Sequence, residues 1–152
     1  MNYDLEHVTG FPELWKDRDP VRPELDVSFK TAPGRSVYGL YGDDGDWKAF
    51  MCCARTSCIP KSVEDLAIHT CPAGSYIIPY TVWSHEKGAG RVIINKILSM
   101  LEHNDIGVNR VVTLSPLTTM AERFHLRNGA EVIRTNATTI NFEYKINNDS
   151  QD

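Results

Sequence analysis

The sequence predicts a mixed α/β domain in which amphipathic helices pack against a sheet. A run of turn-forming residues at 42–46 separates two segments rich in β-branched and aromatic residues, which is typical of a hairpin. Apolar residues then recur with helical spacing over 89–103. Short β-rich and helical segments alternate after that, so the expected order is hairpin, strand, helix, strand, helix, strand, strand.

Size and composition indicate one folded domain over residues 1–152. The chain is 41% hydrophobic and 24% charged, as in ordinary globular proteins. No apolar run approaches the roughly 20 residues of a membrane span, so we expect no membrane partner. Sixteen Lys and Arg against twenty Asp and Glu give a net charge of -4. Because phosphate-backbone binding uses a basic excess, we also expect no nucleic acid partner.

The first half of the chain contains the hairpin and one further strand. Residues 1–36 hold four of the prolines and little periodicity, so we expect an irregular or short-helical segment there. The hairpin strands lie at 37–41 and 47–54, and a short helical turn is expected at 63–68. Residues 75–83 form a strand with Pro79 inside it, which indicates a bulge or an edge.

The second half contains two helices and three strands. The first helix covers about 89–103, with Ile94, Ile97 and Leu101 on one face. A strand at 110–115 ends at Pro116. A second helix over 118–128 is closed by Gly129, the favoured residue after a helix end. Strands at 131–135 and 139–146 follow, and residues 147–152 are expected to be a frayed tail.

No metal site is expected from the cysteines. Cys52 and Cys53 are adjacent, so they point to opposite faces of a strand, and Cys58 and Cys71 follow without the paired spacing of zinc ligands. Reduced thiols in a core strand and its exit loop are the simpler interpretation. No secretory signal is visible at the N-terminus, so we expect a cytoplasmic protein.

The loop at the start of the first helix has features of an anion site. Glycines at a helix entry let the backbone approach a ligand, and the free amides of the first turn favour a negative charge. The alternative is an ordinary turn. The candidate residues for a pyrophosphate are Lys87, Gly88, Ala89, Gly90 and Arg91.

The succession of hairpin, strand, glycine-rich loop, helix, strand and helix resembles the GNAT superfamily of acyl-CoA enzymes over about residues 37–146. His85 stands where that family usually has Gln or Arg, while two loop glycines match. The resemblance implies a GNAT-like, mostly antiparallel sheet with helices on both faces. It also implies that the bulged strand pairs with the pantetheine of CoA, which adds Tyr80 and Val82 to the cofactor-binding residues.

Three further segments resemble the GNAT-like catalytic domain of malonyl-CoA decarboxylases: Phe-His-Leu-Arg-Asn-Gly-Ala at 124–130, Thr-Leu-Ser-Pro at 113–116 and Asn-Phe-Glu-Tyr at 141–144. The resemblance implies that Ser115 and His125 are a catalytic pair and that Tyr144 lines the site. Each residue also has a structural alternative. Ser115 before Pro116 fits a helix N-cap, His125 fits a partly buried histidine, and Tyr144 fits an inward-facing aromatic residue of a strand.

We therefore expect a GNAT-fold enzyme that uses acetyl-CoA or malonyl-CoA as cosubstrate and no metal. The commonest GNAT reaction, acyl transfer to an amine of an unknown small molecule or protein acceptor, is the first hypothesis. Malonyl-CoA decarboxylation with Ser115 and His125 is the alternative. A GNAT-derived binding module without turnover is a third hypothesis, because no carboxylate on the cofactor strand is evident as a base. The oligomeric state is left open.

Overall fold

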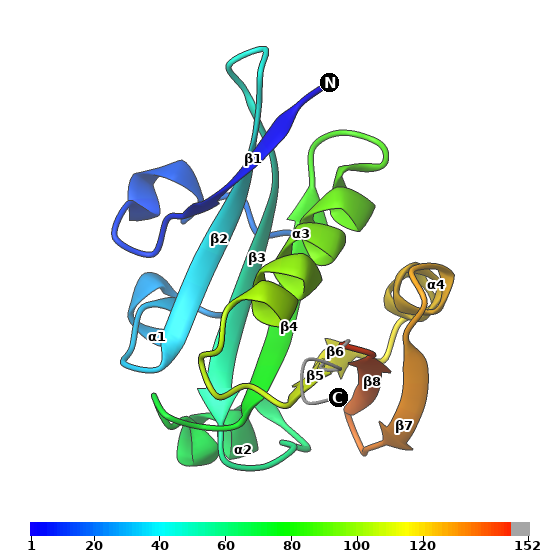
Figure 1. Cartoon of the computed structure of the whole chain (residues 1–152). Coiled ribbons are helices and arrows are strands. Elements are labelled where there is room, and N and C mark those ends of the chain that lie inside the picture. Colours follow the sequence, from blue (N-terminus) through cyan, green and yellow to red (C-terminus); the bar gives the residue numbers. More distant parts are fainter. Residues whose placement is uncertain (147–152) are drawn as a thin grey trace.

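The computed structural model describes residues 1–146, which form one eight-stranded sheet with helices on both faces (Figure 1). The expected tail at 147–152 lies outside the described residues. The strands are β1 (Tyr3–His7), β2 (Arg35–Gly42), β3 (Trp47–Thr56), β4 (Tyr76–Ser84), β5 (Arg110–Val112), β6 (Ser115–Pro116), β7 (Glu131–Thr135) and β8 (Thr139–Tyr144). The helices are a 3₁₀ turn at Pro12–Leu14, α1 (Val27–Lys30), α2 (Val63–His69), α3 (Ala89–His103) and α4 (Thr119–Arg127).

The sheet is mostly antiparallel. Its order is β1-β2-β3-β4-β5-β8-β6, and β7 pairs with β8. Among the described residues, β4 and β5 are parallel and the other paired strands are antiparallel. A parallel pair needs a long crossover, and α3 supplies it. The predicted mixed fold class is therefore confirmed.

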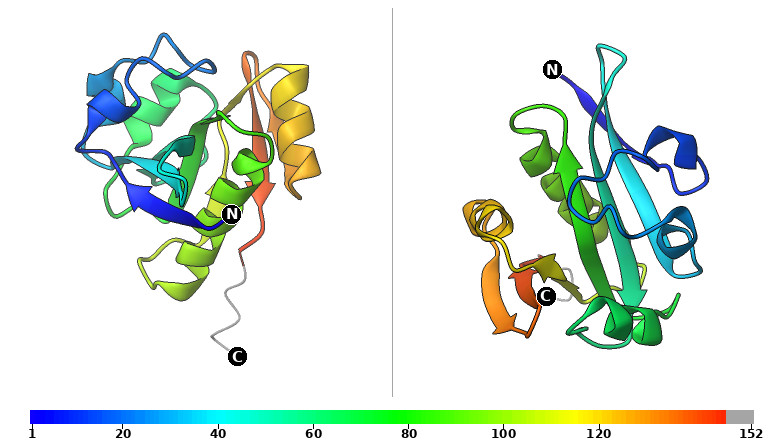
Figure 2. Two further views of the ribbon diagram at one scale, coloured as in Figure 1. Left: turned by 90° about the horizontal axis from the view of Figure 1, so that it is seen from above. Right: turned by 180° about the vertical axis from the view of Figure 1, so that it is seen from behind.

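The two faces of the sheet bury separate apolar clusters. The α3 face contains Met51 and Cys53 of β3 packed with Ile93 and Ile97 of α3. The opposite face contains alternate residues of the same strand with Trp15, α2 and the segment around α1. Seen from above, α3 lies on the side of the sheet opposite to the N-terminal helices (Figure 2). The adjacent thiols of Cys52 and Cys53 thus lie on different faces, as predicted.

The N-terminal segment differs from the expectation for 1–36. Its short helical turns agree with that expectation, but Tyr3–His7 forms β1, which pairs antiparallel with β2 at the edge of the sheet. Asp4, Glu6 and His7 of this five-residue strand are exposed, so it carries too few apolar residues to produce a visible pattern. Its main-chain hydrogen bonds to β2, which depend on no side-chain pattern, hold it in place.

Two strands depart from regular pairing near the middle of the molecule. The register of β3 and β4 shifts between Cys52 and Cys53, which pair with Thr81 and Pro79, so Tyr80 is the extra residue of a bulge. The bulge predicted from Pro79 is confirmed. The single strand expected at 110–115 is instead two short strands, β5 and β6. The change occurs because Thr113 and Leu114 direct their amides to Phe142 and to Pro79, on two different strands.

None of the helices within residues 1–146 has the length and apolar character needed to cross a membrane. In the same part of the chain, no group of three or more His, Cys, Asp or Glu side chains is arranged to hold a metal ion.

Candidate active site

A cleft of about 530 Å³ lies beside the bulge of β4. The carboxyl half of β4 forms one wall, β6 and α4 form the second, and Pro20 and Val21 from the segment before α1 form the third. The predicted site residues that line it are Tyr80, Val82, Gly90, Ser115 and His125. No Asp or Glu is among the lining residues. The cleft therefore suits an acyl chain better than a cationic group.

β4 has a free edge along this cleft. It pairs with β5 only at Tyr76 and Ile77, and one further main-chain bond joins the Leu114 amide to the Pro79 carbonyl at 3.0 Å. From Thr81 to Ser84, β3 is the only strand among the described residues that pairs with β4. Such an edge can pair with an extended ligand that contains amide groups.

The loop before α3 exposes the amides of the helix start. Gly88 is the N-cap and has a φ of 86°, a conformation that glycine adopts without strain. Gly90 is buried against Phe124, whose Cε1 would lie 2.7 Å from an added Cβ. Among residues 1–146, the amides of Gly90 and Arg91 have no acceptor. They are therefore free to bind an anion at the helix N-terminus.

The two cations of this loop differ in their surroundings. Lys87 is exposed. Arg91 instead donates from Nε to Asn128 Oδ1 at 2.9 Å and from Nη2 to the Arg127 carbonyl at 3.1 Å. It thus joins the start of α3 to the end of α4, where carbonyl groups favour a cation. A pyrophosphate contact from its guanidinium stays a prediction, and its main-chain amide is the group left free.

His125 and Tyr144 form a buried pair at the back of the cleft. Nδ1 of His125 lies 2.7 Å from Oη of Tyr144, and the imidazole ring packs between Phe124 and Phe142 at centroid distances of 5.1 Å. Burial lowers the pKa of His125 to about 4. Burial also raises the pKa of Tyr144 above its ordinary value. Both side chains are therefore neutral near pH 7.

The contact between the two rings determines which nitrogen carries the imidazole proton. Within residues 1–146, Tyr144 Oη has His125 as its hydrogen-bond partner and no other. If Nδ1 carried the proton, the phenol hydrogen would have no acceptor in a side chain that is 2% exposed. Leaving a buried donor unpaired costs about 1–3 kcal/mol. The phenol therefore donates to Nδ1, and Nε2–H is a hydrogen-bond donor at the cleft.

Ser115 lies in β6 and not at a helix start. Its register partner is Ile140, and its hydroxyl donates to Thr113 Oγ1 at 2.8 Å. The N-cap of α4 is Thr118, whose side chain accepts from the Ala121 amide at 3.1 Å. The alternative interpretation of Ser115 as a helix cap is thus wrong, because the chain stays extended until Thr118.

The fold and cleft can be compared with known proteins. No protein-family model and no curated protein sequence matches the chain. Among solved structures, the GphF GNAT-like decarboxylase in complex with isobutyryl-CoA has a TM-score of 0.67 at 14% identity, covering 93% of this chain and 98% of that chain. NAA60 of Arabidopsis thaliana, in complex with acetyl-CoA, has a TM-score of 0.62 at 11% identity, covering 94% of this chain and 98% of that chain.

The protein has the GNAT fold. Malonyl-CoA decarboxylase from Agrobacterium vitis is also similar, with a TM-score of 0.63 at 18% identity over 79% of this chain and 35% of that chain. This chain therefore spans about a third of that decarboxylase. At these identities the likeness establishes the fold alone, and the GNAT fold expected from the sequence is confirmed.

The GNAT fold gathers most of the predicted site residues around one cleft. Tyr144 contacts His125 from behind, and Lys87, Gly88, Ala89 and Arg91 lie at the start of α3 outside the lining. Sequence analysis did not identify Asp19 and Arg22, which stand beside the third wall. No pattern marks them, because the carbonyls that Arg22 binds lie 58 and 92 residues away along the chain.

Proposed function

We propose that the protein binds a CoA thioester, with the pyrophosphate at the start of α3 and the acyl group in the cleft. The free amides of Gly90 and Arg91, next to exposed Lys87, suit a phosphate group. The free edge of β4 suits an arm containing amides. The structures of similar fold contain isobutyryl-CoA and acetyl-CoA, which supports this class of ligand.

The reaction that this geometry favours is decarboxylation of a malonyl-type thioester. The bond between the carboxylate and the α-carbon breaks, its electron pair moves toward the thioester carbonyl oxygen, and CO₂ leaves. The resulting enolate takes a proton from water at the α-carbon. Negative charge grows on the thioester oxygen during this step, so a fixed donor aimed at that oxygen lowers the barrier.

The observation that carries the proposal is the 2.7 Å contact between His125 Nδ1 and Tyr144 Oη, from which we infer a neutral Nε2–H donor. Tyr144 holds the ring at 2.7 Å and occupies its other nitrogen, so the donor is oriented before substrate binds. A neutral imidazole can polarise a carbonyl in this way without supplying a full charge. Ser115 adds a hydroxyl donor to the same cleft. It can rotate toward a ligand oxygen for the loss of one hydrogen bond, worth about 1 kcal/mol.

The apolar walls of the cleft also favour decarboxylation. Val82, Phe124 and Met120 surround the acyl end without any carboxylate among the lining residues. A carboxylate moved from water into such surroundings is destabilised, whereas the CO₂ that replaces it is uncharged. The apolar walls of the cleft therefore favour conversion of the substrate carboxylate to CO₂.

Acyl transfer to an amine is the competing function. That reaction needs a base to take the proton of an ammonium group. The lining residues contain no Asp or Glu. Neither ring nitrogen of His125 has a lone pair free to accept a proton, because Nδ1 accepts from Tyr144 and Nε2 carries the ring proton. The same donor would stabilise a tetrahedral intermediate, so transfer to an amine that is already neutral is the form of this alternative that the site accommodates.

The test is incubation of the protein with malonyl-CoA in D₂O without any amine, followed by mass spectrometry of the thioester. The expected product is acetyl-CoA with one solvent deuterium at the α-carbon. The matched controls are the His125→Ala variant and the protein-free solution. Acetyl-CoA is then offered with a panel of amines in a separate reaction.

Each outcome separates the three hypotheses. Conversion of malonyl-CoA without an acceptor supports decarboxylation. Release of free CoA from acetyl-CoA only when an amine is present contradicts it and supports transfer. Calorimetric binding of CoA thioesters with no turnover of either kind supports a binding module.

A further inference from the structure

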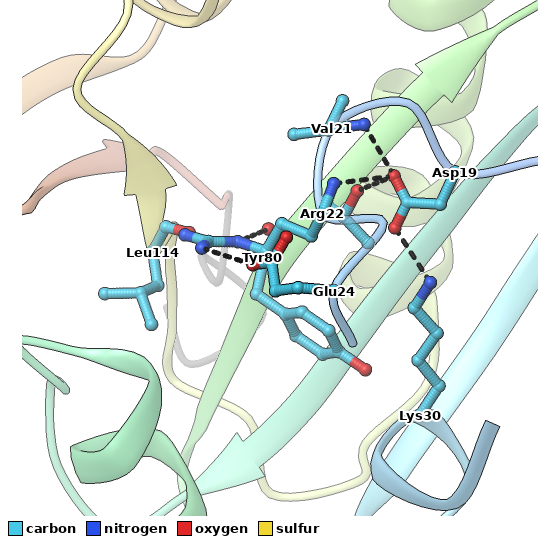
Figure 3. Close-up of polar contacts among 8 residues, drawn as sticks. Asp19, Val21, Arg22, Glu24, Lys30, Tyr80 and Leu114 are labelled. Atoms are coloured by element: carbon cyan, nitrogen blue, oxygen red, sulfur yellow. Dashed lines mark hydrogen bonds and ion pairs between the residues drawn. The ribbon is translucent and has the colours of Figure 1, made fainter. Parts of the chain in front are cut away.

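Three charged side chains, those of Asp19, Arg22 and Lys30, are buried next to the cleft wall that Pro20 and Val21 form (Figure 3). Asp19, Arg22 and Lys30 are 7%, 6% and 2% exposed. Asp19 and Arg22 flank Pro20 and Val21 in the chain, and Lys30 is the last residue of α1. The binding and chemistry proposed above use none of the three.

Asp19 fixes this segment against β4. Its Oδ1 accepts from the main-chain amides of Val21 at 2.8 Å and Arg22 at 3.0 Å, and from Thr81 Oγ1 at 2.9 Å. Its Oδ2 accepts from Lys30 Nζ at 2.8 Å. Both oxygens of the buried carboxylate are thus hydrogen bonded and its charge is paired, and one of its partners, Thr81, directly follows the bulge residue of β4.

Arg22 bridges β4 and the short segment that leads into β6. Its Nε donates to the Tyr80 carbonyl at 2.8 Å, and its Nη2 donates to the Leu114 carbonyl at 2.8 Å (Figure 3). Tyr80 is the bulge residue of β4, and Leu114 directly precedes Ser115. The guanidinium therefore joins one wall of the cleft to the residue that leads into the other.

The bridge lies where sheet hydrogen bonding ends. The last main-chain bond between the two segments runs from the Leu114 amide to the Pro79 carbonyl. One residue further along β4, the Tyr80 carbonyl has Arg22 as its partner in place of a strand. Two donors in a rigid planar fork can hold two carbonyls at a set separation, which a lysine ammonium on a flexible stem does not do.

We propose that Arg22 is a positioning residue: it fixes the separation of β4 from the Leu114–Ser115 segment and so sets the place of Ser115 in the cleft. The effect on turnover rests on the proposed function. The effect on the geometry does not, because it concerns hydrogen bonds within the chain.

The test compares Arg22→Lys and Arg22→Met with a matched control, Arg55→Lys. Arg55 also bridges carbonyls of two segments, Gly74 and Ile106, with distances of 2.7 and 2.8 Å from Nη2. It pairs with Ile77, so it lies toward the opposite end of β4 from the cleft. The control removes the same kind of bridge without touching the cleft.

Two readouts are measured on each variant. The first is hydrogen exchange of the Leu114 amide, which reports the bond that closes the sheet beside the bridge. We expect exchange about 10-fold or more faster in both Arg22 variants and unchanged in Arg55→Lys. The second is turnover of malonyl-CoA. A misplaced catalytic group costs roughly 10²-fold in rate, so kcat should fall by about that factor while KM changes little.

The outcomes distinguish this proposal from the proposed function. Wild-type exchange at Leu114 in Arg22→Lys, or wild-type kcat in that variant, would overturn the positioning role of Arg22. A positive charge without the two-carbonyl bridge would then be enough to maintain the geometry of the cleft. Equal losses in Arg55→Lys would also overturn this role. If the wild-type protein does not turn over malonyl-CoA, the proposed function fails and Leu114 exchange alone decides the role of Arg22. If Arg22→Met does not fold, Arg22→Lys provides the same decision.

Discussion

The cleft lies between two buried polar clusters that are built in opposite ways. On the α4 side, His125 and Tyr144 are neutral and share one hydrogen bond. On the other side, Asp19, Arg22 and Lys30 are charged, and the carboxylate of Asp19 accepts four hydrogen bonds. Both clusters are almost fully removed from water.

The difference indicates which cluster reacts and which supports. A group with an unused donor can offer it to a ligand, and the Nε2–H of His125 is such a donor. The carboxylate of Asp19 spends its four hydrogen bonds on groups of the chain itself, so it contributes rigidity and position instead. The comparison predicts that changes in the first cluster affect turnover and that changes in the second affect stability and geometry.

The largest expected effect is on turnover in the first cluster. Replacing His125 with Ala should lower kcat for malonyl-CoA by roughly 10²–10⁴-fold, the range for losing a fixed donor or acid. Calorimetric affinity for acetyl-CoA should change little, because the loop before α3 is separate from His125. Wild-type turnover in His125→Ala at saturating substrate would remove His125 from the mechanism.

The next effect is on stability in the second cluster. Asp19→Asn removes the anion that pairs with the buried ammonium of Lys30, and an uncompensated buried charge costs about 3–5 kcal/mol of unfolding free energy. Urea denaturation measures it. The matched control is Glu143→Gln, which breaks the partly exposed pair with Arg110 and should cost about 1 kcal/mol or less. Equal losses of unfolding free energy in Asp19→Asn and Glu143→Gln would contradict the claim that the buried cluster supports the fold more than a surface ion pair does.

The buried imidazole also makes stability depend on pH. Its pKa is about 4 in the folded protein and about 6.5 in an unfolded chain. The unfolded state therefore binds the proton first as pH falls. The contribution is fully present above pH 6.5 and is lost between pH 6.5 and 4, with a total of about 3 kcal/mol. Urea titrations at several pH values should show this slope in the wild type and a smaller slope in His125→Gln.

A smaller effect separates two neighbouring hydroxyl residues. Thr118→Ala removes the cap of α4 and should cost about 1 kcal/mol of stability. Ser115→Ala should reduce turnover by about 10²-fold, because a hydroxyl donor of the cleft is lost. Thermal unfolding and kcat are measured on both variants. A stability loss without a turnover loss in Ser115→Ala would assign Ser115 to the framework.

The sequence predicted the elements whose signals are local. The helix expected over 89–103 coincides with α3 because its glycine entry and polar exit stand next to the apolar stripe. The bulge was also predicted from a local signal, because Pro79 lies inside the strand that bends. β1 and the bridge of Arg22 could not be predicted, because both depend on main-chain groups far along the chain. The N-cap of α4 was missed because Ser115 precedes Pro116 and Thr118 follows it by two residues, and only the backbone conformation distinguishes these two candidates.

The most direct test of the account is the protonation state of His125, measured by ¹⁵N NMR of the imidazole nitrogens in the folded protein. We predict a neutral ring at pH 7 with the proton on Nε2, an unprotonated Nδ1 that accepts from Tyr144, and a titration midpoint near pH 4. In Tyr144→Phe the preference for the Nε2–H form should weaken. A proton on Nδ1, or a charged imidazolium at pH 7, would contradict the central claim that His125 offers a neutral donor to the cleft.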